Sequence, residues 1–106
     1  MKTKLIALFL CLLCQSAYAV LARGIPDCGE WLKTDPTEQL RTKSWLIGYL
    51  SGINIGFRIE KQRDFNYFDN VTNDQIFLWM DKYCRANPLS TVAVGSADLY
   101  QEMSNK

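Results

Sequence analysis

The stretch from Trp45 to Phe57, WLIGYLSGINIGF, constrains the fold more than any other part of the chain. Eleven of its thirteen residues are apolar or glycine, and Gly48, Gly52 and Gly56 recur at every fourth position. Residues four apart lie on one face of a helix, so the three glycines would form a smooth strip, which we call the glycine seam. A helix that is apolar nearly all round belongs inside a core. We therefore predict a buried helix with another helix packed backbone to backbone along the seam.

A small residue at every fourth position also occurs where membrane helices associate. Thirteen apolar residues are too few for that reading, because a bilayer needs about 20. Each glycine inside a helix costs roughly 1 kcal/mol relative to alanine, so a closely packed neighbour has to compensate. Asn54 is a polar exception within the stretch. We expect it to have a hydrogen-bond partner, since a buried unpaired amide costs about 1 to 3 kcal/mol.

The first nineteen residues have the pattern of a secretory signal peptide. Its parts are the basic residues Lys2 and Lys4, an apolar run over residues 5–13, and the small-x-small cleavage site Ala-Tyr-Ala at residues 17–19. We predict cleavage after Ala19, which leaves residues 20–106 as a single domain. The expected location is the periplasm, with no stable membrane insertion after cleavage.

Only two cysteines, Cys28 and Cys84, remain beyond the predicted cleavage site. In an oxidising compartment, two cysteines in a small exported chain most simply pair with each other. Closing a loop of about 57 residues would stabilise the fold by on the order of 4 kcal/mol in the chain-entropy model. The alternatives are two free thiols or a bridge between two molecules.

Three helix start signals follow one another along the chain. Each has an N-cap residue with an acidic or amide side chain three positions later: Asp27 with Glu30, Asp35 with Glu38, and Thr72 with Gln75. Together with the apolar spacing they predict helices over residues 28–33, 36–59, 73–87 and 89–103. We expect the 36–59 helix to be polar in its first two turns and buried in its latter half.

The last of these helices, over residues 89–103, has a predicted inner side. That side comprises Leu89, Val92, Ala93, Ser96, Leu99 and Met103. The small residues Gly95, Ser96 and Ala97 would let this helix lie against the glycine seam. No stretch alternates with a period of two residues, which excludes a sheet. The predicted fold is all-α, a small bundle of three main helices and one short N-terminal helix, with one disulfide.

The segment over residues 60–71, EKQRDFNYFDNV, interrupts the helical pattern with mixed charges and three aromatic residues. One interpretation is a surface loop that tucks its aromatic side chains beneath itself. The other is a recognition segment, since aromatic residues and arginine are enriched at interface hot spots. In that case Arg63, Phe65, Tyr67 and Phe68 would contact a partner.

The composition argues against catalysis and against nucleic-acid binding. The chain has no histidine, and both remaining cysteines are expected in a disulfide, so no catalytic or metal-binding residue and no cofactor is predicted. Without Lys2 and Lys4 the chain carries 10 basic and 11 acidic residues, whereas nucleic-acid binding needs a basic surface. We therefore expect a protein that is not an enzyme and that acts by binding another protein.

The order of residues along the chain resembles two related groups of small exported bacterial proteins. The positions that carry the resemblance are Cys28, Trp31, Leu32, Gly48, Tyr49, Gly52, Asn54, Thr72, Gln75, Ile76, Tyr83, Cys84, Asn87 and Pro88. One group is the resistance-associated (Rap/Tai) immunity proteins, which neutralise type VI secretion amidase toxins in the periplasm. The other is the HdeA-like acid-stress chaperones.

The first resemblance implies a periplasmic protein that binds and inhibits a cell-wall amidase toxin. Members of that group typically carry further cysteines, including one near the C-terminus, and this chain has none after Cys84. The second implies a chaperone that binds client proteins in acid, where Asp and Glu, with pKa values of about 3.9 and 4.3, become protonated. The expected partner is thus a toxin or a client protein. A homodimer paired through the glycine seam is compatible with either function.

Overall fold

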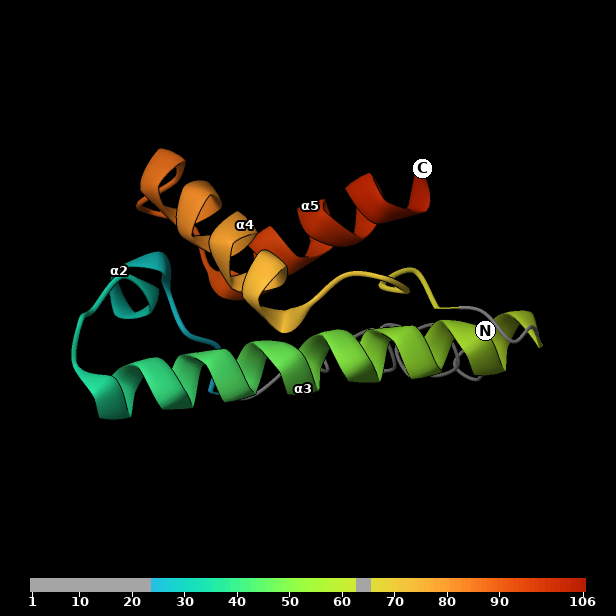
Figure 1. Cartoon of the computed structure of the whole chain (residues 1–106), viewed down its shortest axis with the longest axis horizontal. Coiled ribbons are helices and arrows are strands. Elements are labelled where there is room, and N and C mark those ends of the chain that lie inside the picture. The colour runs from blue at the N-terminus through green and yellow to red at the C-terminus, as the bar shows by residue number, and fades with distance from the viewer. Residues whose placement is uncertain (1–23, 63–65) are drawn as a thin grey trace, which may run out of the picture.

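The computed structural model describes residues 24–62 and 66–106, and this part of the chain contains four helices (Figure 1). They are α2 (Cys28–Trp31), α3 (Pro36–Lys61), α4 (Asn73–Ala86) and α5 (Val92–Ser104). The described part has no strand, only an isolated bridge between Asp27 and Thr91. Within it, no helix has both the length and the apolar character needed to cross a bilayer. The prediction of an all-α fold with three main helices and a short one is confirmed.

The predicted start signals cap the helices. At α2, the Asp27 side chain accepts a hydrogen bond from the Glu30 amide (2.7 Å), and the Glu30 carboxylate accepts one from the Asp27 amide (3.1 Å). Thr72 and Gln75 form the same reciprocal pair at α4. At α3, the Asp35 side chain accepts from the amide three residues later. These local bonds supply acceptors for amides that a helix leaves unpaired in its first turn.

The start of α5 differs from the prediction. The sequence predicts that the helix begins at Leu89. In the structure Thr91 is the N-cap, and the Thr91 hydroxyl accepts a hydrogen bond from the Val94 amide (3.2 Å). Leu89 lies in the preceding turn and is 100% exposed, so its predicted place on the inner side is wrong. Of the other predicted inner residues, Val92, Ser96 and Leu99 are buried, and Ala93 and Met103 are half-buried.

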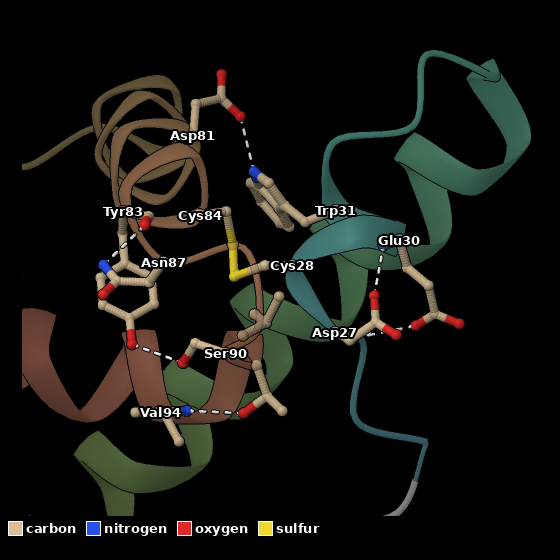
Figure 2. Close-up of a disulfide and its surroundings, with 12 residues drawn as sticks. Asp27, Cys28, Glu30, Trp31, Asp81, Tyr83, Cys84, Asn87, Ser90 and Val94 are labelled. Atoms are coloured by element: carbon tan, nitrogen blue, oxygen red, sulfur yellow. Dashed lines mark hydrogen bonds between the residues drawn. A yellow bond between two sulfur atoms is a disulfide. The ribbon is translucent and has the colours of Figure 1, made fainter.

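The core is built around the disulfide between Cys28 of α2 and Cys84 of α4 (Figure 2). The two Cα atoms are 4.9 Å apart and both side chains are fully buried, which confirms the predicted pairing. Next to it, the indole nitrogen of Trp31 donates a hydrogen bond to the Asp81 carboxylate (2.7 Å). The remaining buried members of the cluster are Leu46, Leu50, Ile76, Met80, Val92 and Leu99.

Main-chain hydrogen bonds tie the segment around α2 to the turn before α5. The Cys28 amide donates to the Ser90 carbonyl (3.0 Å), and the Val92 amide donates to the Pro26 carbonyl (2.9 Å). The Ser90 hydroxyl is also hydrogen-bonded to the Tyr83 hydroxyl (2.7 Å). α2, the end of α4 and the start of α5 are therefore joined covalently and by hydrogen bonds at one place.

The latter half of α3 is not buried, which corrects our prediction. The buried residues of α3 are Thr42, Leu46 and Leu50, whereas Ile55 is 53% exposed and Ile59 is 73% exposed. α3 has 26 residues and is about 39 Å long, while α4 and α5 have 14 and 13 residues. Figure 1 shows α3 along one side of the molecule, with the two shorter helices on the other. They are too short to cover its whole length.

The glycine seam does not pack against α5, so this prediction is also wrong. Apart from the neighbouring residues and backbone of α3 itself, a Cβ atom added at Gly48, Gly52 or Gly56 would meet no described atom within 4 Å. The close contact is made by Gly95 instead, where a Cβ atom would lie 2.8 Å from Met80 Sδ. The side of α5 that carries Gly95 therefore packs on α4, whereas Ala97 is exposed and faces the groove beside α3.

Candidate functional site

The second half of α3 and α5 form the two sides of a groove, which we call the wedge. Figure 1 shows the segment over residues 66–72 running between these two helices. Its main pocket has a volume of about 480 Å³. The described residues that line it are Ile53, Phe57 and Lys61 of α3, Tyr67, and Ala97, Tyr100, Gln101 and Ser104 of α5. Most of this lining is aromatic or aliphatic.

An aromatic cluster forms the inner wall of the wedge. The Tyr100 ring stacks on the Phe57 ring at a centroid distance of 5.2 Å. The rings of Tyr67 and Phe68 meet Tyr100 edge-on at 4.9 and 5.7 Å. Tyr67 and Phe68 are half-buried, so these two aromatic side chains pack beneath their own segment. Such contacts contribute about 0.5 to 1.5 kcal/mol each beyond the buried area, and they hold the segment in place.

The structure describes two of the four predicted contact residues. Arg63 and Phe65 lie outside the described residues. Tyr67 and Phe68 face the fold, and a contact with a partner through them stays a prediction. The sequence reasoning did not identify Tyr100, the centre of the cluster. Its position four residues after Ser96, which was predicted to face inward, is the signal that could have found it.

The Tyr100 hydroxyl is unusual for a buried polar group. The side chain is 9% exposed, and among the described residues its hydroxyl has no hydrogen-bond partner. Burial raises the pKa of Tyr100 above its ordinary value of 10, and the nearby Tyr67 raises it further. Most buried polar groups are paired, so an unpaired one calls for an explanation.

A second, more polar pocket of about 290 Å³ lies on the other side of the 66–72 segment, between α3 and the start of α4. Here the Asn54 side-chain nitrogen donates to Asn66 Oδ1 (3.1 Å), which confirms that Asn54 has a partner. Asn66 Oδ1 also accepts from the Phe68 amide (3.0 Å). Asn54 Oδ1 is buried and has no partner within the described part of the chain. These bonds attach the segment to α3.

The outer side of α3 forms a second exposed surface, which we call the α3 face. It consists of Gly48, Ser51, Gly52, Ile55, Gly56 and Ile59, all of them exposed. No charged residue occurs anywhere between positions 44 and 57, a run of about four helical turns. The α3 face is therefore a continuous, uncharged strip. Two isoleucine side chains project from it, and the helix backbone is uncovered at the three glycines.

Charged residues of α3 occur in its first turns and in its last turn, where Arg58 and Lys61 lie. Arg41 is paired with Glu38 (3.0 Å) and with Glu30 (3.6 Å), and its hydrogen bond to Glu38 raises the Arg41 pKa. Within residues 24–62 and 66–106, no cluster of three or more Cys, Asp or Glu side chains is placed to hold a metal ion. The wedge and the α3 face present mainly aromatic, aliphatic and small polar groups, with the Lys61 side chain at the wedge, and such groups suit binding.

Comparisons with protein-family models, with curated proteins and with solved structures found no match to this chain. The resemblance to the immunity proteins and to the acid-stress chaperones stays a prediction from the sequence.

Proposed function

We propose that this chain is an exported, non-enzymatic protein that acts by binding another protein through the α3 face. The observation that carries the proposal is the exposure of Ile55 (53%) and Ile59 (73%) on a helix with no charge between residues 44 and 57. Interface cores are depleted in charged residues, and a contiguous apolar patch on a small protein often marks a contact site.

The glycine seam supports this proposal energetically. Each of its three glycines costs roughly 1 kcal/mol of helix stability relative to alanine. No described residue packs on them closely enough to compensate. A partner helix could approach the bare backbone there, and burying one isoleucine fully is worth about 1.5 to 3 kcal/mol. The seam thus has a role in binding rather than in the core.

The more specific form of the proposal is an immunity protein that inhibits a cell-wall amidase toxin in the periplasm. The sequence resemblance to the Rap/Tai group and the predicted signal peptide support it. The disulfide between Cys28 and Cys84 is consistent with an oxidising compartment. The partner would then be a toxin that places an apolar side chain or helix against the α3 face.

The test is inhibition of a cell-wall amidase encoded next to this chain, measured as release of peptide from purified peptidoglycan. The wild-type protein should inhibit, and Ile55→Glu and Ile59→Glu should each weaken inhibition because they place a charge in the contact. Leu78→Glu is the matched control, since Leu78 is 67% exposed on α4. Inhibition that survives both α3 variants would exclude the α3 face, and no inhibition by the wild type would exclude the immunity function.

The second candidate is an acid-stress chaperone of the HdeA type. The exposed α3 face favours this function, because such a chaperone binds unfolded client proteins through apolar surface that its monomer exposes. It should suppress aggregation of a client at a pH near 3, where carboxylates become protonated. Light scattering measures this, and a client that aggregates at the same rate with and without the protein would remove the chaperone function.

A further inference from the structure

The main pocket of the wedge has the properties of a site for a small apolar ligand. Its volume of about 480 Å³ falls in the range of about 300 to 1,000 Å³ that is usual for such sites. Ile53 and Phe57 line it from α3, and Ala97 and Tyr100 line it from α5. The walls are therefore formed by two helices, and the aromatic cluster holds the 66–72 segment beside them.

The described lining of this pocket includes one charged side chain, that of Lys61. Lys61 is the single charged member among the described residues that line it, and its Nζ atom lies 5.6 Å from the centre of the Phe57 ring. A cation next to a mostly apolar lining is complementary to a ligand with an apolar body and one negative charge. A membrane surface with many anionic head groups is instead recognised by clusters of basic residues, and the described part of this lining contains no such cluster.

Tyr100 contributes its ring to the pocket. The residue lines the pocket and is nine-tenths buried, and its hydroxyl oxygen is itself buried, with no hydrogen-bond partner in the described part of the chain. A ligand in the pocket would therefore contact the Tyr100 ring rather than its hydroxyl. The pocket offers a cation together with mostly apolar walls.

The spacing along α3 limits the length of the ligand. Ile53 and Lys61 are eight residues apart in one helix, which is about 12 Å along its axis. An extended hydrocarbon advances about 1.3 Å for each C–C bond of about 1.5 Å, so about eight to ten carbons span this distance. We propose that the wedge binds one free medium-chain fatty acid, with its carboxylate at Lys61 and its acyl chain along Ile53, Ala97 and the Tyr100 ring.

The experiment is isothermal titration calorimetry of the purified protein with decanoate below its micelle concentration. We expect saturable binding of one decanoate per chain. Decanol, which lacks the charge, should bind about two- to five-fold more weakly, the range for an exposed ion pair. Decyltrimethylammonium, with the opposite charge, should bind more weakly still. Equal binding of all three would overturn the proposal.

Two pairs of variants locate the site. Ala97→Phe fills the pocket from an exposed position of α5 and should abolish binding, whereas Val94→Phe, on the same helix but outside the lining, should leave it unchanged. Lys61→Gln should weaken decanoate binding about two- to five-fold. Lys43→Gln is its control, because the Lys43 Nζ atom also lies over a phenylalanine ring, that of Phe77 (5.1 Å), away from the pocket.

The proposal is overturned if decanoate does not saturate, or if Ala97→Phe binds it as the wild type does. It is also overturned if the protein binds vesicles of anionic phospholipid but not free decanoate, since the occupant would then be a membrane. Circular dichroism of each variant confirms that its helices are intact before its affinity is compared. None of these outcomes depends on whether the α3 face binds a partner protein.

Discussion

Two glycines in similar helices should respond in opposite ways to the same substitution. Gly95 is buried in α5, and an added Cβ atom would lie 2.8 Å from both Met80 Sδ and Tyr83 Cδ1. Gly52 is exposed in α3, and no described atom outside the neighbouring residues and backbone of α3 lies within 4 Å of its Cβ position. Alanine is therefore accommodated at Gly52 and crowded at Gly95.

The neighbours of Gly95 decide how large the effect is. The Tyr83 ring stacks on Trp79 at 5.5 Å with an angle of 8° between the planes, and its hydroxyl is hydrogen-bonded to Ser90. It cannot move away from a new methyl group without losing these contacts. Overpacking of this kind costs about 1 to 3 kcal/mol. Alanine recovers roughly 1 kcal/mol of helix propensity at either position. Gly52→Ala should thus stabilise by up to about 1 kcal/mol, and Gly95→Ala should destabilise by up to about 2 kcal/mol.

Thermal unfolding followed by circular dichroism at 222 nm measures both variants. In a domain of this size 1 kcal/mol shifts the melting temperature by about 4 to 8 °C, so the two variants should differ clearly. Gly48→Ala is a matched control and should behave like Gly52→Ala, because its Cβ position is equally open. A lower melting temperature for Gly52→Ala would refute the reasoning, as it would mean that the seam packs against something within the chain. A higher one for Gly95→Ala would refute the close contact of α5 with α4.

Replacing both Cys28 and Cys84 by serine should lower the free energy of unfolding by about 4 kcal/mol in the chain-entropy model, and a loss below about 1 kcal/mol in urea unfolding would contradict it. Asp81→Ala should cost about 1 to 3 kcal/mol because it leaves the buried indole N–H of Trp31 unpaired. Asp81→Asn keeps an acceptor and should cost less, so equal losses would argue against this bond. The Tyr100 pKa is raised in the folded protein, so above pH 10 the unfolded chain loses the Tyr100 proton more readily than the folded chain does. The contribution of Tyr100 to the free energy of unfolding is therefore fully present below pH 10 and is lost as the pH rises through the pKa of the folded state. Tyr100→Phe should reduce the alkaline loss of stability, and an unchanged slope would exclude Tyr100 as its cause.

Local signals in the sequence predicted the elements well. The side chains of Asp27, Asp35 and Thr72 cap three helices because capping depends on residues only three positions away. The pairing of Cys28 with Cys84 followed from their number and the predicted compartment. The all-α bundle could therefore be predicted from local sequence patterns, without knowledge of contacts between distant residues.

Which face of each helix meets a neighbour could not be predicted in the same way. A run of glycines at every fourth position permits close approach, but it does not say whether the approaching helix belongs to the same chain. The seam of α3 is open to its surroundings within the described part of the chain, and Gly95 makes the close contact instead. The wedge was missed for a related reason. It depends on where the 66–72 segment crosses between α3 and α5, and no local pattern around Tyr67 or Tyr100 fixes that path.

The disulfide places the covalent link of the fold at one end of the molecule. Cys28, Cys84 and the main-chain bonds of Ser90 and Val92 join the segments there, whereas among the described residues the far turns of α3 and α5 are joined by side-chain contacts such as the stacking of Phe57 on Tyr100. Separating the two helices at that end would cost aromatic contacts of about 0.5 to 1.5 kcal/mol each and would leave the disulfide intact. A ligand of the wedge would therefore bind at the end that side-chain packing alone holds closed among the described residues.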